Sequence, residues 1–152
     1  AVTVHKSCQP FASTTHVVPP AVVLGMGCRK NKESEAVEKA AFSCLKENDI
    51  YPEAVAALAS IDVKKEEPGL LALSEKLGVP FKTFSSEELL SVQGEFTSSS
   101  FVSKTVGVDN VCERSAVKAA ENHTGIHFIQ RKRGAEGVTT ALVLGDWRIR
   151  FE

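Results

Sequence analysis

The stretch VLGMGCRKNK, residues 23–32, joins an apolar run to two closely spaced glycines and a group of basic residues. Residues 21–26 have the length and apolarity of a buried β-strand that ends at a glycine turn. Beyond the turn, apolar residues recur at helical spacing, at Val37, Ala40, Ala41, Cys44 and Leu45. A buried strand, a glycine turn and an amphipathic helix in this order indicate an α/β fold.

The rest of the chain continues to alternate between strand and helix patterns. Glu66-Glu67-Pro68 opens a helix, because acids favour the helix dipole and proline at the first position loses no hydrogen bond. Near the C-terminal end, two predicted strands are joined by a basic turn, Arg131-Lys132-Arg133-Gly134. The pattern predicts a three-layer α/β/α domain with a mostly parallel sheet and a C-terminal hairpin. The predicted strands cover residues 21–26, 55–61, 81–84, 127–130 and 138–144.

The first 20 residues differ from the rest of the chain. They show no hydrophobic period and end in Pro19-Pro20, so we expect a tail or linker remnant over residues 1–20. The length of 152 residues suits one hydrophobic core. We therefore expect a single α/β domain over residues 21–152.

Composition and charge argue against several classes of protein. A net charge of −1 leaves no strong overall field for nucleic acid. No apolar stretch has the length of a membrane span and no leader resembles a signal peptide, so we expect a cytoplasmic protein without a membrane partner. The four cysteines are widely spaced, which favours free thiols over a disulfide framework or a metal site.

The glycine loop matches neither of two common nucleotide-binding fingerprints. Both GxGxxG and GxxxxGK[ST] require a glycine at position 30, where this chain has Lys30. Two interpretations remain: a tight turn with solvated charges, or a junction whose backbone N–H groups and cations bind an anion. Cys28 is likewise either a nucleophile near a helix start or a small buried residue.

A second polar loop, Asp62-Val63-Lys64-Lys65-Glu66-Glu67, occupies the equivalent position after the next predicted strand. The carboxyl ends of neighbouring parallel strands converge on one crevice in an open α/β sheet. Basic residues gather at three strand–loop junctions, at 29–30, 64–65 and 131–133. Each charge taken alone also fits capping or solvation, but the combination predicts a crevice that binds a polyanionic small molecule.

Four blocks carry a family resemblance. In chain order they are VVLGMGCRKN, LASIDVKKEEPGLLALSEKLGVPF, FVSKTVGVDNVCERSAVKAA and RKRGAEGVTTALVL. They resemble the C-terminal domain of the cobalamin biosynthesis protein CbiG, which is similar to the stand-alone protein CobE, and they extend over about residues 21–145. The resemblance implies an α/β domain associated with modification of the corrin macrocycle.

The resemblance also implies a set of site residues. The positions expected to bind the substrate are Gly25, Gly27, Cys28, Arg29, Ser99 and Lys132. The positions expected to take part in catalysis are Asp62, Lys64 and Glu67.

Full-length CbiG proteins are similar to cobalt-precorrin-5A hydrolases, which open a ring lactone and release acetaldehyde. The resemblance therefore implies Glu67 or Asp62 as the base that activates water, with Lys64 and Arg29 as electrostatic partners. It implies a corrinoid intermediate as ligand and an N-terminal domain of the same protein as partner. It implies no cofactor, because any cobalt belongs to the substrate.

Two other functions stay open at this point. The domain is alternatively a CobE-like module that binds a tetrapyrrole for other enzymes and has little activity of its own. A nucleotide-binding α/β domain is a third candidate, supported only by the position of the glycine loop.

Overall fold

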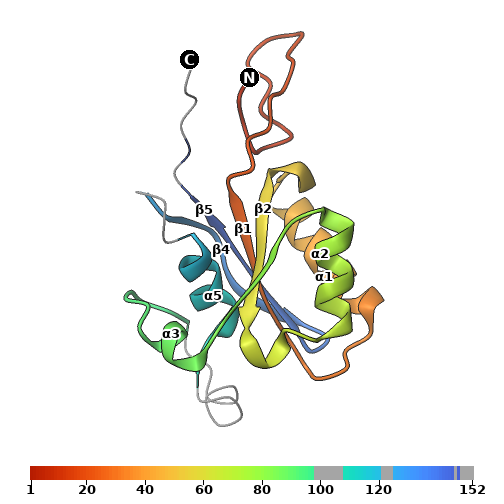
Figure 1. The fold of residues 1–152 in the computed structure, drawn as a ribbon. Coiled ribbons are helices and arrows are strands. Elements are labelled where there is room, and N and C mark those ends of the chain that lie inside the picture. Colours follow the sequence, from red (N-terminus) through yellow and green to blue (C-terminus); the bar gives the residue numbers. More distant parts are fainter. Residues whose placement is uncertain (98–107, 121–124, 146, 148–152) are drawn as a thin grey trace.

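A five-stranded sheet forms the centre of the computed structural model, which describes residues 1–97, 108–120, 125–145 and 147 (Figure 1). The strand order is β3-β2-β1-β5-β4. The strands are β1 (Val22–Cys28), β2 (Val55–Ile61), β3 (Phe81–Phe84), β4 (His127–Ala135) and β5 (Val138–Leu144). The helices are α1 (Ser34–Glu47), α2 (Pro68–Leu77), α3 (Ser86–Leu90) and α5 (Val111–Ala119), with 3-10 turns at Pro52–Ala54 and Asp62–Lys64.

The sheet is mixed. The β1–β2 and β2–β3 pairs are parallel, whereas the β1–β5 and β4–β5 pairs are antiparallel. The α/β/α architecture and the C-terminal hairpin are confirmed, but a mostly parallel sheet overstates the count of parallel pairs. The reason is that the hairpin adds its second strand alongside β1 over the whole length of β1, from Val22 opposite Leu144 to Cys28 opposite Val138.

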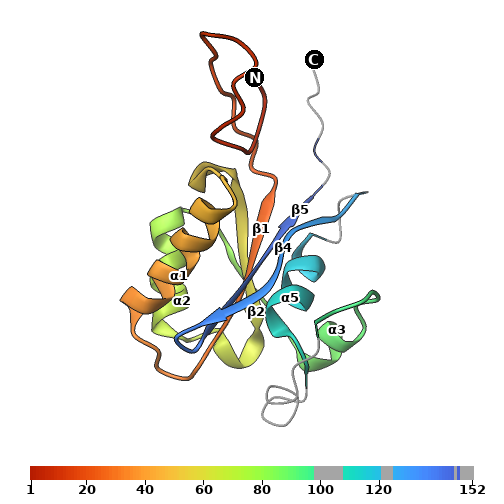
Figure 2. The same ribbon diagram turned by 180° about the vertical axis from the view of Figure 1, so that it is seen from behind.

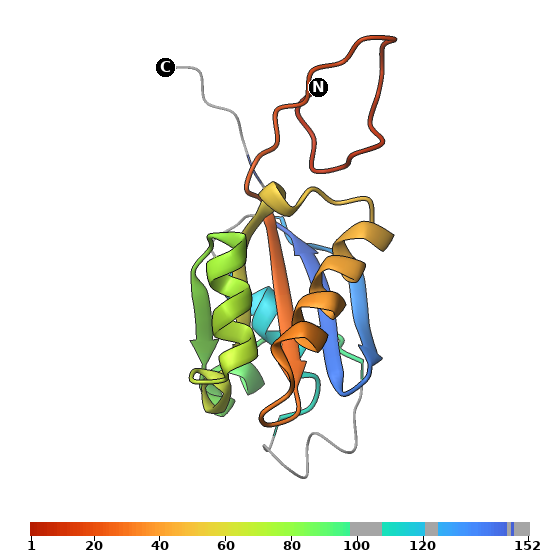
Figure 3. The same ribbon diagram turned by 90° about the vertical axis from the view of Figure 1, so that its right-hand side faces the viewer.

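Helices cover both faces of the sheet (Figures 1 and 2). Helices α1 and α2 lie side by side on one face, as Figure 3 shows, because each follows a parallel strand and crosses in the same sense. Helices α3 and α5 lie on the opposite face. The main core lies between α1, α2 and the sheet, and its largest fully buried side chains include Leu24, Met26, Leu45, Leu58 and Leu142.

Helix α5 approaches β1 more closely than a side chain on β1 would permit. A Cβ at Gly25 would lie 1.9 Å from the carbonyl oxygen of Cys112 and 2.8 Å from the Cβ of Ala116. Glycine at position 25 is therefore a packing requirement, and Gly25 lies beneath the helix. Gly25 is covered by α5 and does not line the pocket described below, so the structure does not support the substrate-binding role expected for it.

The β4–β5 hairpin differs from the prediction. Residues 131–134 lie within β4, and the turn is formed by Glu136 and Gly137, whose φ angles are 53° and 79°. Two residues with positive φ match the twist of the flanking strands, and Gly137 adopts that backbone conformation without strain. The basic residues therefore belong to a strand, and the face of the sheet on which each lies depends on strand geometry.

Residues 1–20 form a loop that contains no helix and no named strand. Isolated β-bridges join Val2 to Val17 and His5 to Ile50, and Val4 is 4% exposed within the main core. The loop stands at the end of the sheet opposite the β4–β5 turn (Figure 3). Its first residues thus pack on the domain, and a domain boundary after residue 20 stays a prediction.

Glu113 in α5 is a buried carboxylate that joins three segments. It accepts hydrogen bonds from the N–H and the hydroxyl of Thr97 (3.1 and 2.8 Å) and from the N–H of Lys132 (2.6 Å). Burial raises the pKa of Glu113, but the hydrogen bonds from Lys132 and Thr97 outweigh it and leave the pKa below the usual 4.5. The charged form is therefore the one that holds α5, β4 and the segment at Thr97 together.

The close approach at Gly25 predicts a position-specific cost. We expect Gly25→Ala to lower the free energy of unfolding by about 1–3 kcal/mol, because the added methyl group pushes α5 away from β1. Gly134→Ala is the matched control, since a Cβ there meets its nearest neighbour at an ordinary 3.5 Å. Urea unfolding followed by circular dichroism measures both variants. A parental midpoint for Gly25→Ala would contradict the packing requirement.

The lowered pKa of Glu113 predicts the pH dependence of its contribution. Because the folded-state pKa lies below 4.5, the contribution is complete above about pH 4.5 and is lost as the pH falls through the folded value. At pH 7 we expect Glu113→Gln to cost about 1–3 kcal/mol of unfolding free energy, since its amide nitrogen faces a donor. Urea unfolding between pH 7 and pH 3 should show the two proteins converging in acid. A constant difference across this range would show that the charge is not responsible.

Candidate functional site

A cavity of about 630 Å³ lies at the carboxyl ends of β1 and β2. The loop after β1, the turn after β2, the first residue of α5 and the end of the β4–β5 hairpin form its walls. Ile61, Val111 and Val138 contribute apolar surface. We call this cavity the basic pocket, because four of its lining residues are cations: Arg29, Lys30, Lys64 and Lys132.

The charges around the basic pocket are unbalanced. Glu136 is the one carboxylate among the residues that line it. Among the described residues, Lys64 forms an ion pair with Glu67, whereas Arg29, Lys30 and Lys132 form none. Unpaired cations around one cavity attract an anionic ligand and repel each other without one.

Five of the predicted site residues meet at this pocket. Gly27, Cys28, Arg29, Lys64 and Lys132 all line it, although they come from three separate segments of the chain. The prediction that the loops after the first two strands converge is therefore consistent with the structure.

The hairpin turn supports the β1 loop. The N–H of Arg29 donates to the carbonyl oxygen of Gly137 at 3.1 Å. A Cβ at Gly137 would lie 3.2 Å from Cδ of Arg29, so the glycine leaves room for the arginine stem over the turn. Gly27 similarly leaves room for Thr139, whose hydroxyl donates to the Gly27 carbonyl oxygen at 3.3 Å. Both glycines allow β1 and the hairpin to form adjacent walls.

Lys64 and Glu67 form a partly buried ion pair at the edge of the pocket. Their side chains are 15% and 6% exposed, and Nζ of Lys64 lies 3.5 Å from Oε2 of Glu67. Oε1 of Glu67 is buried and has no hydrogen-bond partner among the described residues. A buried carboxylate oxygen without a partner is costly, so this atom is available to a water molecule or to a ligand hydroxyl.

Cys28 is not an activated thiol. Burial raises its pKa above the usual 9.0, Lys64 opposes this rise, and Glu67 adds to it. The thiol is therefore protonated at neutral pH, and Cys28 packs against the main core. Of the two interpretations of this residue, the structure favours a packing residue on the pocket wall.

The remaining predicted residues lie elsewhere. Gly25 lies beneath α5, as described above, and Asp62 is half-buried at the start of a 3-10 turn without lining the pocket. Ser99 lies outside the described residues. Glu67 lies behind Lys64 rather than on the pocket wall.

The three basic residues of β4 separate between the two faces of the sheet. Lys132 lines the basic pocket, whereas Arg131 reaches Glu113 and Arg133 reaches Glu47 of α1. The expectation that all three face one crevice is therefore wrong for Arg131 and Arg133.

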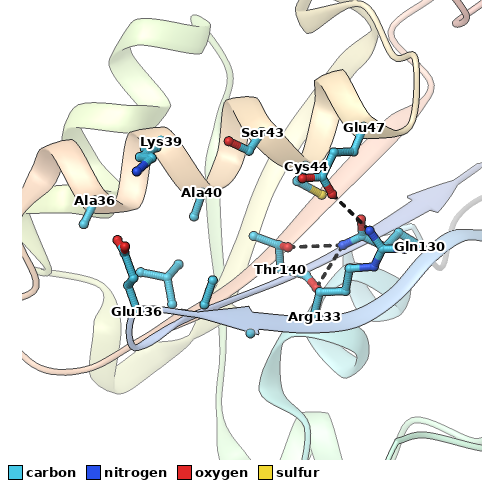
Figure 4. Close-up of a pocket in the computed structure, with 13 residues that line it drawn as sticks. Ala36, Lys39, Ala40, Ser43, Cys44, Glu47, Gln130, Arg133, Glu136 and Thr140 are labelled. Carbon is cyan, nitrogen blue, oxygen red and sulfur yellow. Dashed lines mark hydrogen bonds and ion pairs between the residues drawn. The ribbon is translucent and has the colours of Figure 1, made fainter.

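A second cavity, of about 310 Å³, lies on the other side of the hairpin beneath α1 (Figure 4). Gln130 forms its buried end, where the Gln130 amide accepts from Asn48 at 2.7 Å and donates to the hydroxyl of Thr140 at 3.2 Å. Arg133 and Glu47 form an ion pair at 3.0 Å across its mouth (Figure 4). Gln130 and Thr140 thus bond to each other, as do Arg133 and Glu47, whereas Lys39 and Glu136 also line this cavity and form no ion pair among the described residues.

Glu113 is a buried residue beside the pocket that no sequence pattern predicted. A charged residue beside the apolar and small residues Val111, Cys112 and Ala116 was the available signal, but the partners of Glu113, Thr97 and the backbone of Lys132, lie in other segments. Among the described residues, no three histidines, cysteines or acids are grouped to hold a metal ion. None of the described helices is long and apolar enough to cross a membrane.

Comparison with known proteins shows the family of this chain. The family model described as cobalamin synthesis G C-terminus matches residues 22–143. A cobalt-precorrin-5A hydrolase of Salmonella typhimurium is 40% identical over 95 residues, which are 62% of this chain and 27% of that protein. The hydrolase of the same name from Priestia megaterium is 30% identical over 128 residues, 84% of this chain and 34% of that protein. The chain thus spans about a third or less of these two relatives.

This chain is also similar in fold to a solved structure. The crystal structure of CobE, a protein from the cobalamin (vitamin B12) biosynthetic pathway, superposes with a TM-score of 0.74 at 28% identity. The match covers 82% of this chain and 89% of CobE. The relatives named as hydrolases support a role in cobalamin biosynthesis. With most of its length matched by the family model, the chain belongs to the family of cobalamin synthesis G C-terminal domains.

Proposed function

We propose that this domain binds a corrinoid intermediate in the basic pocket, as part of a protein that hydrolyses cobalt-precorrin-5A. The observation that carries the proposal is the ring of four cations around a cavity of about 630 Å³. Corrinoid intermediates carry acetate and propionate arms on a largely apolar macrocycle. A pocket with cations at its rim and apolar side chains on its walls is complementary to part of such a molecule.

The pocket cations differ in how they would pair with the carboxylates of these arms. Arg29 presents a planar guanidinium that pairs with a carboxylate through two hydrogen bonds, whereas Lys132 offers a point charge. Lys64 is already paired with Glu67, so a substrate carboxylate competes with Glu67 for it. Ligand binding at Lys64 and the state of Glu67 are therefore linked.

This linkage makes Glu67 a better candidate than Asp62 for the catalytic base. Hydrolysis of a lactone requires a group that accepts a proton from the attacking water and a cation that stabilises the developing oxyanion. Glu67 has one buried oxygen without a partner and lies beside Lys64. Neither carboxylate lines the pocket, but among the described residues Glu67 forms an ion pair with a pocket cation and Asp62 does not. In this proposal Glu67 accepts the proton and Lys64 stabilises the oxyanion.

A second candidate function is binding without catalysis. The chain matches 89% of CobE but only 27% and 34% of the two hydrolases, which leaves room in the longer proteins for catalytic groups in another domain. A protonated Cys28 also removes one nucleophile from this domain. In this version the domain holds the tetrapyrrole, and a partner domain of the longer protein supplies the chemistry.

We place this function in the cytoplasm. The four cysteines are free thiols, and a disulfide-free chain suits a reducing compartment.

Removal of pocket charge should weaken ligand binding without unfolding the domain. We expect Arg29→Glu and Lys132→Glu each to weaken the binding of cobyrinic acid about ten- to a hundred-fold, equivalent to roughly 1.5–3 kcal/mol per charge-assisted contact. Arg133→Glu is the control, because Arg133 lies on the α1 side of the sheet. Absorbance titration gives the dissociation constants, and circular dichroism checks folding. Parental affinity in both pocket variants would refute the ligand assignment.

The proposed base predicts a difference between two carboxylates. In the full-length protein acting on cobalt-precorrin-5A, we expect Glu67→Gln to reduce acetaldehyde release about 10²–10⁴-fold, the usual range for loss of a general base. Asp62→Asn and Cys28→Ser should retain near-parental turnover, because neither group is placed to accept the proton. A fully active Glu67→Gln protein that binds substrate normally would instead support binding without catalysis by this domain.

A further inference from the structure

Among the described carboxylates that form ion pairs, Glu113 is the most deeply buried, and its side chain is 0% exposed. It accepts from Thr97 twice, from the N–H of Lys132 at 2.6 Å and from the guanidinium of Arg131 at 3.4 Å. Three of these four donors are neutral groups, and two of those are backbone N–H groups. The carboxylate is therefore arranged to hold the main chain in place as well as to pair with a cation.

A bulge in β4 explains why the N–H of Lys132 is free to make this bond. Gln130 lies opposite Leu142 and Arg133 lies opposite Thr140, so β4 advances by three residues where β5 advances by two. The one extra residue of β4 therefore lies in the two-residue segment Arg131-Lys132. A bulge leaves backbone groups outside the strand ladder, and one of them, the N–H of Lys132, donates to Glu113.

The same bulge decides on which side of the sheet Lys132 lies. Gln130 lies on the α1 face, where it bonds to Asn48. Strict alternation would place Lys132 on that face as well and Arg133 on the other face. The structure shows the reverse, because Arg133 pairs with Glu47 of α1 and Lys132 lines the basic pocket.

We propose that Glu113 is a positioning residue that fixes the β4 bulge and thereby holds Lys132 in the basic pocket. Its carboxylate meets the main chain of Lys132 at the extra residue, so loss of the carboxylate frees the strand to return to regular pairing. The ligand-binding part of this inference rests on the proposed function. The part that concerns the placement of Lys132 does not.

A general stabilising role predicts a different result, and helix α5 offers the matched comparison. Asp109 and Arg114 form an ion pair at 3.0 Å at the start of the same helix, away from the backbone of Lys132. If Glu113 only stabilised α5, Asp109→Ala and Glu113→Ala would differ in stability but would leave the contribution of Lys132 to binding unchanged.

The test is a pair of double-mutant cycles with cobyrinic acid as the probe and its fully amidated form as the neutral control. We expect Lys132→Ala to weaken binding about tenfold with Glu113 in place and less than about twofold in the Glu113→Ala protein. The cycle of Glu113→Ala with Lys64→Ala should be additive, as should the cycle of Asp109→Ala with Lys132→Ala. If Glu113→Ala does not fold, Glu113→Asp takes its place in the same cycles. The aspartate keeps the charge, but its side chain is shorter by one methylene and withdraws the carboxylate from the N–H of Lys132.

Crystal structures of the same variants separate this inference from the proposed function. Displacement of Lys132 from the pocket in the Glu113 variant upholds the positioning role, even where the parent protein does not bind the probe and the corrinoid proposal fails. An unmoved Lys132, or a full tenfold effect of Lys132→Ala in the absence of Glu113, overturns it.

Discussion

The pairing of β5 with β1 is the interaction on which the candidate site depends. Seven residues of β1 pair antiparallel with seven residues of β5, from Val22 to Cys28. This pairing brings the β4–β5 turn beside the carboxyl ends of β1 and β2, where the loops that carry Arg29 and Lys64 emerge. A parallel neighbour in the same place would end at this edge and would not bring a hairpin turn there. The basic pocket is therefore a product of the mixed sheet.

The electrostatics of the pocket indicate function because its charges are not satisfied internally. The second cavity contains similar residue types, yet its glutamine, threonine, arginine and glutamate bond to one another (Figure 4). In the basic pocket, the pair of Lys64 with Glu67 leaves one carboxylate oxygen without a partner. A buried carboxylate oxygen of this kind is costly unless a water molecule or a ligand hydroxyl bonds to it. This contrast is the physical reason for proposing a ligand site on the α5 side of the hairpin.

Glycine is required at positions 25 and 27 of the stretch 23–32 for two different packing reasons. Gly25 makes room for α5, and Gly27 makes room for Thr139 of the neighbouring strand. A strand–glycine–helix pattern was compatible with phosphate binding, but here the glycines serve the packing of the sheet against a helix and a hairpin. The basic residues that follow them then define the pocket rim.

Much of this fold followed from the sequence. Strand and helix periodicity placed β1, β2, β3, β5 and the helices between them, because burial on one face leaves a local pattern of apolar residues. The hairpin was predicted, but its turn was not, since three basic residues followed by a glycine resemble a loop while Glu136-Gly137 supplies the positive φ angles. The convergence of Arg29, Lys64 and Lys132 was predicted from the ends of neighbouring strands.

Tertiary structure decided which side of the sheet each of these residues occupies. Alternation along β4 would have put Lys132 beneath α1, and a bulge of one residue, bonded to Glu113, moves it to the basic pocket. The carboxylate and the bulge belong to segments separated by 19 residues, so no local pattern reveals their contact. The same holds for Gly25 and Cys112, whose approach only the assembled layers define. Sequence periodicity determines the elements because burial is local, whereas register and contacts between layers arise from the packing of the whole chain.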